Sequence, residues 1–194
     1  MAVKAIIGLG NPGPEYENTR HNAGAWLVEQ LARGAAETLR SERKFLGLYT
    51  RIRLGEHDLH LLNPTTFMNR SGASVAALCQ FFKIMPDELL VAHDELDIDP
   101  GYARYKTGGG HGGHNGLRDI VSALGNNNGF HRLRIGIGHP GSAKQVTHYV
   151  LGSPAKTERH AIDDAIDEIQ VTLPDALAGN WAKAMNRLHS FKPD

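Results

Sequence analysis

The stretch AIIGLGNPGPEYENTRHNAG, residues 5–24, joins an apolar run, a glycine loop and a polar segment that leads into a second apolar run. Val3 to Leu9 is apolar, includes β-branched residues and is followed by glycine and proline, which predicts a buried strand. Ala23 to Ala32 predicts a helix. A buried strand, a loop and a helix in this order are typical of the start of an α/β protein.

Further strands and helices alternate along the chain. Residues 48–62 mostly alternate between polar and apolar side chains, and a turn over 55–58 predicts a hairpin. Val75, Leu78, Cys79 and Phe82 have helical spacing, which places Cys79 in the core rather than in a catalytic role. The other expected elements are strands over 88–97, 102–106 and 132–138, a helix from Asn115 as N-cap to Gly125, a helix from Ser153–Pro154 that breaks at Pro174, and a last helix carrying Leu177, Trp181 and Leu188.

Together these elements predict an α/β fold with a single domain over residues 1–194, a sandwich of a twisted mixed β-sheet flanked by helices. A chain of 194 residues with 41% hydrophobic content is long enough to bury one core. The single cysteine excludes an internal disulfide, and neither a signal segment nor an apolar run of membrane-spanning length is present. We therefore expect a cytoplasmic protein that does not contact a membrane.

The charge distribution is uneven although the net charge is zero. An anionic partner must therefore be bound by a local patch. Residues 85–100 hold acidic side chains and no lysine or arginine. Residues 101–134, in contrast, hold a single acidic residue, Asp119, and five basic ones, Arg104, Lys106, Arg118, Arg132 and Arg134. This asymmetry suits a protein that binds nucleic-acid phosphates on one face.

The glycines at positions 8, 10 and 13 have the spacing of a dinucleotide-binding loop. That interpretation requires an acidic residue at the end of a second strand, and the candidate, Glu29, lies inside the predicted helix. Pro12 and Pro14 also lack the N–H groups that would meet a pyrophosphate. A dinucleotide-dependent oxidoreductase is therefore a disfavoured alternative.

Several polar or aromatic residues lie instead at strand ends and in loops, where α/β sheets usually form their sites. They are Asn11, Tyr16 and His21 in the first loop, Phe67 and Asn69 after the hairpin, Asp94 at the end of a strand, and His111, His114 and Asn115 in a glycine-rich loop. The two loop histidines are compatible with metal ligation, but no cysteine nearby completes a site. We expect them to order the loop or to contact the edge of the substrate.

Five segments closely resemble bacterial-type peptidyl-tRNA hydrolases. They are GLGNPGPEYENTRHNAG (8–24), PTTFMNRSG (64–72), HDELD (93–97), GGGHGGHNGLRD (108–119) and FHRLRIGIGHP (130–140). The resemblance implies a monomeric α/β hydrolase that cleaves the ester between a peptide and the 3′ ribose of tRNA, which recycles tRNA from aborted translation. It also implies that no metal and no organic cofactor is used.

The resemblance also implies a role for individual residues. His21 matches the catalytic base of the family, and Asp94 matches the carboxylate that supports it. The other matches are Asn11, Asn69 and Asn115 as amides that hold the substrate, Tyr16 and Phe67 as the lining of the cleft, and Lys106 and Arg134 as the basic pair that meets the tRNA phosphate. Every position holds the expected residue type.

The implied chemistry is physically consistent. An imidazole suits the activation of water near neutral pH, and His21 precedes the first predicted helix, whose dipole favours the neutral ring. Asp94 would instead raise the pKa of His21, and the sequence leaves the balance open. The asparagines offer N–H donors for a developing oxyanion and acceptors that select an acylated amino group. The second alternative is a non-catalytic RNA-binding protein on the same fold.

Overall fold

The strands and helices alternate along the chain as the sequence predicts. In this computed structural model, which describes residues 2–194, the strands are β1 (Ala5–Gly8), β2 (Arg40–Glu42), β3 (Gly47–Leu54), β4 (His57–Pro64), β5 (Leu89–Glu95), β6 (Ala103–Thr107) and β7 (His131–Gly136). The helices are α1 (Ala23–Gly34), α2 (Ser71–Phe82), α3 (Asn115–Ala123), α4 (Val146–Val150), α5 (Lys156–Leu177) and α6 (Trp181–Ser190).

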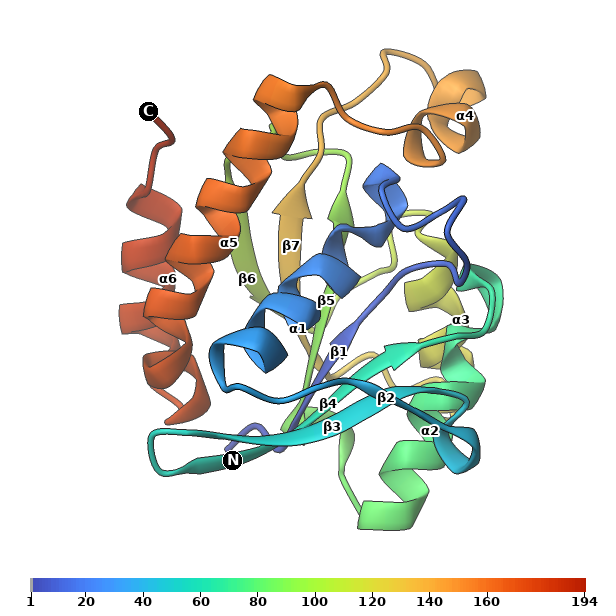
Figure 1. Cartoon of the computed structure of the whole chain (residues 1–194), viewed down its shortest axis with the longest axis vertical. Coiled ribbons are helices and arrows are strands. Elements are labelled where there is room, and N and C mark those ends of the chain that lie inside the picture. Colours follow the sequence, from blue (N-terminus) through green and yellow to red (C-terminus); the bar gives the residue numbers. More distant parts are fainter. Residues whose placement is uncertain (1) are drawn as a thin grey trace.

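The strands form one twisted, seven-stranded sheet in the order β2-β3-β4-β1-β5-β7-β6 (Figure 1). The central strand β1 pairs in parallel with β4 and β5, and β5 pairs in parallel with β7. In contrast, β3 and β6 run antiparallel to their neighbours. The sheet is therefore mixed, which confirms the predicted fold class, and the carboxyl ends of β1, β4, β5 and β7 share one edge.

Helices cover both faces of the sheet, and each face has its own hydrophobic core. In one core, α1, α5 and α6 pack on side chains such as Ile6, Leu61 and Leu90. In the other, α2 and α3 pack on Leu62 and Val91. Neighbouring residues of one strand thus point to opposite faces, as the period of a β-strand requires. Figure 1 shows α1 crossing the central strands and α5 beside α6 near β6 and β7.

The glycines of the opening segment are explained by close packing between β1 and α1. A side chain at Gly24 would collide with the carbonyl oxygen of Ala92, and one at Gly8 would lie 2.6 Å from the carbonyl oxygen of Gly24. A Cβ at Gly10 would lie 2.8 Å from the Asn22 side chain. Helix α1 begins only at Ala23, so no helix N-terminus follows the glycine loop directly. The loop therefore lacks the geometry of a dinucleotide site.

The hairpin of β3 and β4 and the burial of Cys79 agree with the sequence, but the predicted break at Pro174 is wrong. Helix α5 continues through Pro174, and Leu177 belongs to its last turn rather than to the last helix. The proline removes one backbone hydrogen bond, while the buried side chains of Leu173, Ala176 and Leu177 hold the last turn against the core. The short elements β2 and α4 were not predicted.

None of the helices within residues 2–194 is long and apolar enough to cross a lipid bilayer.

Candidate active site

A cleft of about 690 Å³ lies at the carboxyl ends of the central strands. Polar side chains reach it from the loop after β1, from the segment between β4 and α2, from the end of β5 and from the start of α3. The cleft brings together seven of the predicted residues, Asn11, Tyr16, His21, Phe67, Asn69, Asp94 and Asn115, and also His111 and His114. Residues far apart in sequence thus share one cavity because parallel strands end at one edge.

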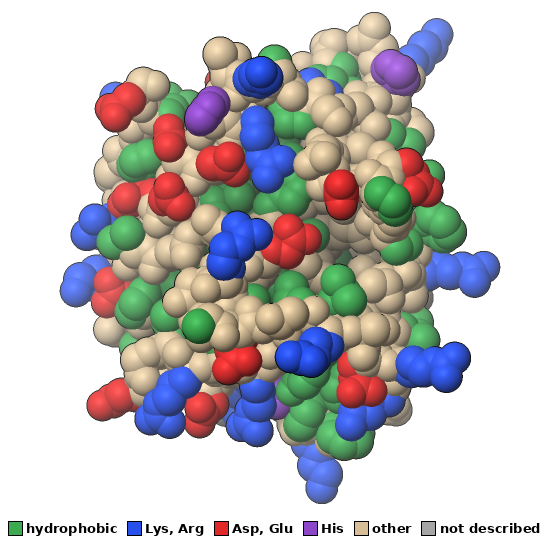
Figure 2. Space-filling model, in the orientation of Figure 1, with side chains coloured by type: hydrophobic (Ala, Val, Ile, Leu, Met, Phe, Trp, Pro, Cys, Tyr) green, Lys and Arg blue, Asp and Glu red, His purple; other side chains and the backbone are tan. Residues whose placement is uncertain are grey.

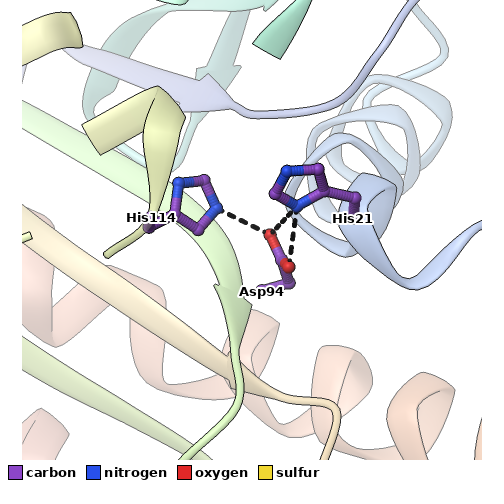
Figure 3. Close-up of side chains that lie close together, drawn as sticks. All are labelled: His21, Asp94 and His114. Atoms are coloured by element: carbon purple, nitrogen blue, oxygen red, sulfur yellow. Dashed lines mark hydrogen bonds and ion pairs between the residues drawn. The ribbon is translucent and has the colours of Figure 1, made fainter. Parts of the chain in front are cut away.

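His21 and Asp94 form a buried pair in this cleft. His21 lies in a single 3₁₀ turn, Arg20–Asn22, directly before α1, and Asp94 is near the end of β5. The His21 Nδ1 atom lies 3.0 Å from Asp94 Oδ1 and 2.9 Å from Oδ2 (Figure 3). The carboxylate accepts a hydrogen bond from Nδ1–H, which fixes the tautomer and leaves the lone pair of the neutral ring on Nε2.

His114 binds the same carboxylate from the opposite side (Figure 3). Its Nε2 atom lies 2.7 Å from Asp94 Oδ1. Its Nδ1 atom accepts hydrogen bonds from the backbone N–H groups of Gly116 and Leu117, at 3.1 and 3.3 Å. An acceptor cannot carry a proton, so the proton of the neutral ring is on Nε2, which donates to Asp94. His114 is therefore the N-cap of α3, and the prediction that Asn115 caps this helix is wrong.

The pKa values of the pair follow from this arrangement. Burial lowers the pKa of His21, but the charge of Asp94 and its hydrogen bond raise it, and the net effect is a pKa above 6.5. Burial raises the pKa of Asp94, but His21 and His114 outweigh burial and hold it well below its usual range. The carboxylate is thus ionised at neutral pH, and its influence on His21 prevails.

Asn11 is held rigidly beside this pair. The Asn22 side chain accepts a hydrogen bond from the backbone N–H of Asn11 at 2.8 Å and donates one to its carbonyl oxygen at 3.0 Å. Asn11 Oδ1 accepts a hydrogen bond from the backbone N–H of Met68 at 2.7 Å. Because its oxygen is engaged in this way, the Nδ2 group of Asn11 is the part of the amide left to donate into the cleft.

The other predicted cleft residues are more exposed. Tyr16 and Phe67 meet edge to face, with ring centroids 6.3 Å apart, and Phe67 is 57% exposed. Asn69 is exposed near Phe67, and Asn115 is exposed at the start of α3. Asn115 Oδ1 accepts only a long hydrogen bond from Arg118, at 3.4 Å. These side chains are free to turn toward a ligand.

Lys106 and Arg134 lie outside the main cleft and line a second cavity of about 230 Å³ beside it. The two cavities share His93, Glu95, Asp97, His111 and Gly112. Lys106 is on β6 and is exposed, whereas Arg134 is on β7 and donates through Nε to Glu95 Oε1 at 2.8 Å. The predicted basic pair thus adjoins the His21–Asp94 cleft without being part of it.

Sequence reasoning missed three contacts in this region. Asn22 holds Asn11. Arg132, which was expected in the phosphate-binding basic patch, is instead buried and donates to the carbonyl oxygens of Gly109 and Gly110. The link from His114 to Asp94 was missed as well, although a loop-ordering role was expected for His114. None of these contacts has a sequence signal of its own, because each joins residues 11 to 23 positions apart.

His21, Asp94 and His114 also offer potential metal-ligand atoms within 4.8 Å of one another. However, the hydrogen bonds place a proton on both nitrogens that face the carboxylate. A metal ion would have to displace both protons and break the bonds to Asp94. The donor set in this protonation state is that of a hydrogen-bonded triad rather than of a metal centre.

The fold and the cleft define a class of protein, an α/β protein with a buried His–Asp pair suited to proton transfer and with basic residues beside it. Comparisons with known proteins narrow the class. The family model described as Peptidyl-tRNA hydrolase matches residues 5–194. Peptidyl-tRNA hydrolase of Chromohalobacter salexigens is 75% identical over 189 residues, which cover 97% of each chain. That of Pseudomonas paraeruginosa is 59% identical over 191 residues, which cover 98% of each chain.

A solved structure agrees with these sequence comparisons. The crystal structure of peptidyl-tRNA hydrolase from Acinetobacter baumannii superposes with a TM-score of 0.95 at 50% identity and covers 99% of this chain and 97% of that one. The chain therefore belongs to the peptidyl-tRNA hydrolase family, as its motifs indicated. It is accordingly an enzyme with peptidyl-tRNA hydrolase activity, not a dinucleotide-dependent oxidoreductase or a non-catalytic RNA-binding protein.

Proposed function

We propose that the chain hydrolyses the ester between the peptide and the 3′ ribose of tRNA with His21 as general base. The observation that carries this proposal is the bond from His21 Nδ1 to Asp94, which leaves the basic Nε2 atom for the cleft. Nε2 accepts a proton from water while the water oxygen attacks the ester carbonyl carbon. When the bond from carbon to the 3′ oxygen breaks, the imidazolium returns the proton to that oxygen.

Asp94 and His114 hold His21 in the geometry that this reaction requires. The carboxylate fixes the tautomer of His21 and stabilises the imidazolium that forms. His114 keeps the carboxylate ionised and oriented, and its own ring is fixed by the start of α3. His114 is thus a positioning residue in this proposal, since its bonds go to Asp94 and to backbone.

The asparagines supply amide groups to the reacting ester. We assign Asn11 Nδ2 as the donor to the developing oxyanion, because its oxygen is already bonded to Met68. A fixed donor of this kind is worth ~3 kcal/mol in the transition state. Asn69 and Asn115, which are exposed, bind the acylated amino group and so favour peptidyl-tRNA over aminoacyl-tRNA.

The basic residues beside the cleft bind the tRNA. Lys106 and Arg134 would contact a phosphate in the second cavity, and Arg132 fixes the backbone of the glycine loop next to them. Tyr16 and Phe67 line the opposite part of the cleft, which suits the peptide. The two halves of the substrate would thus leave the ester in different directions.

We further propose that the enzyme acts as a monomer in the cytoplasm and requires no metal, organic cofactor or membrane. The protonation pattern around Asp94 supports the metal-free reaction, since both histidines donate to the carboxylate. Activity that survives exhaustive chelation would agree with this part of the proposal. A light-scattering mass equal to that of one chain would agree with the monomer.

Replacement His21→Ala tests the central step. We expect release of peptide from N-acetyl-aminoacyl-tRNA to fall by about 10³-fold or more, because the variant lacks the Nε2 atom that accepts the proton of water. Binding of uncleaved tRNA, measured by filter retention, should stay near that of the native enzyme. Turnover within tenfold of the native rate would contradict the assignment of His21.

A further inference from the structure

The order of the strands places the basic residues and Phe67 on opposite sides of the His21–Asp94 pair. Asp94 is near the end of β5, and next to β5 on one side come β7 with Arg134 and β6 with Lys106. On the other side come β1, which leads to Asn11, and β4, which leads to Phe67. Phe67, Asn11 and Tyr16 line the main cleft and are absent from the lining of the second cavity. A peptide that leaves the ester on the side of β1 and β4, away from the tRNA, passes Phe67.

An exposed leucine continues this direction beyond Phe67. Leu46 lies just before β3, the next strand in the sheet order, and is 46% exposed. Its carbonyl oxygen accepts hydrogen bonds from Thr65, 3.0 Å from the backbone nitrogen and 3.2 Å from the hydroxyl. Thr65 is exposed and precedes Phe67 by two residues. The surface from Phe67 to Leu46 is therefore connected through one fixed loop contact.

The backbone of Leu46 is in a strained conformation. Leu46 has a φ of 51° in the left-handed region, which costs a leucine roughly 1–2 kcal/mol and which glycine or asparagine adopts more easily. Burial of the side chain offsets little of this free energy, since nearly half of it is exposed. The strained backbone, rather than exposure alone, makes Leu46 a candidate for contact with a ligand.

A second exposed apolar side chain, Phe81, is in the last turn of α2. Phe81 is 56% exposed and meets Phe45, the residue before Leu46, at 5.4 Å between ring centroids. The Nζ atom of Lys44 lies 4.3 Å from the Phe81 ring centroid. Figure 2 shows hydrophobic side chains gathered at the lower end of the molecule, with lysines and arginines beside them, where α2 ends in Figure 1. We call Leu46, Phe81 and Lys44 the distal strip.

We propose that the distal strip binds the peptide part of the substrate, several residues away from the ester. The proposal deepens the function proposed above and rests on it. An extended peptide that passes Phe67 lays apolar side chains on Leu46 and Phe81, and Lys44 attracts an acidic side chain or the peptide carbonyls. The strip is on the far side of Asp94 from Lys106 and Arg134, which favours the peptide over the tRNA as its occupant.

The test compares substrates that differ only in peptide length. One substrate is N-acetyl-aminoacyl-tRNA, and the others carry apolar peptides of up to about ten residues, which span ~33 Å when extended. The double variant Leu46→Asn/Phe81→Ala removes both apolar side chains. Asparagine tolerates the left-handed backbone at position 46, and alanine favours the helix at position 81. Val171→Ala, at another exposed apolar position on a helix, is the matched control.

With the native enzyme, kcat/KM should rise with peptide length until the peptide covers the strip. The double variant should lose about tenfold of kcat/KM on the longest substrate, the effect of uncovering two half-exposed apolar side chains. It should match the native enzyme on N-acetyl-aminoacyl-tRNA, which also shows that it is folded. Val171→Ala should follow the native enzyme at every length.

Three outcomes would overturn the proposal. Equal length profiles for the native enzyme and the double variant would show that the peptide does not touch the strip. An equal loss at every length that weakens with added salt would identify the strip as an RNA contact instead. If the native enzyme does not hydrolyse even N-acetyl-aminoacyl-tRNA, the function proposed above fails, and the peptide strip fails with it.

Discussion

The His21–Asp94 cleft and the second cavity beside it differ in how firmly they hold their polar groups. In the cleft, the side chains of His21, Asp94 and His114 are at most 11% exposed. Three hydrogen bonds join the two histidines to the carboxylate of Asp94. In the second cavity, in contrast, Lys106 is exposed, and the loop that follows it has positive φ at Gly108, Gly109, Gly112 and Gly113.

This difference matches two different physical tasks. Proton transfer requires donors and acceptors that are fixed before the substrate arrives, because reorganisation would raise the barrier. Binding a large polyanion relies on charge, which acts at longer range and tolerates mobile side chains. Replacements on the buried side should therefore change kcat, and replacements on the exposed side should change KM and its salt dependence. The predictions below test this division.

Asp94→Asn should have the largest effect. Asparagine keeps the shape of the carboxyl group but removes the charge that stabilises the imidazolium and fixes the tautomer of His21, so kcat should fall by ~10³–10⁴-fold. The measurement is single-turnover release of peptide. Asp58→Asn, an exposed position on β4, is the control and should leave kcat unchanged.

The same variant has a distinct pH signature. The pKa of His21 is raised above 6.5 by Asp94, so activity of the native enzyme should fall as pH drops through a value above 6.5. Without the charge of Asp94, burial alone remains and lowers the pKa of His21. The acidic limb of the kcat/KM profile, which reports the enzyme without substrate, should then move to lower pH, and an unmoved limb would show that another group titrates.

His114→Asn should have a smaller effect that separates its two contacts. Asparagine is a good N-cap for α3 but is too short to reach Asp94, so thermal stability should change little while kcat falls by about tenfold. His160→Asn, at an exposed position on α5, is the control. Equal losses of stability and activity would instead mean that His114 serves only the helix.

Much of the fold could be predicted from the sequence because it depends on local patterns. The apolar runs of β1 and β5 and the alternation of β3 and β4 follow the period of a strand, and polar residues after them mark the site. The path of α5 through Pro174 could not be predicted, because the contacts that hold its last turn come from other elements. Local propensity is overridden by tertiary packing at that position.

The site could be predicted as a set of residues but not as a network. Position at a strand end marks Asn11 and Asp94, and the resemblance marks His21. The hydrogen bond from His114 to Asp94 and those between the Asn22 side chain and the Asn11 backbone join residues far apart in sequence. No periodic pattern of apolar residues predicts such contacts. The direction of the pKa shift of His21 likewise depends on burial and on a charge from a residue 73 positions away.

Lys106→Ala should have the smallest effect and the one that best distinguishes the second cavity from the His21–Asp94 cleft. Loss of one phosphate contact should raise KM by about fivefold at low salt and reduce the slope of log KM against log salt by about one, with kcat unchanged. Lys183→Ala, at an exposed lysine on α6, is the control for net charge. A fall in kcat for Lys106→Ala would mean that the exposed side also positions the ester, since the glycine loop packs on the Lys106 side chain and leads to His114. The separation between fixed catalytic groups and mobile tRNA-binding groups would then not hold for the glycine loop, which connects Lys106 to His114.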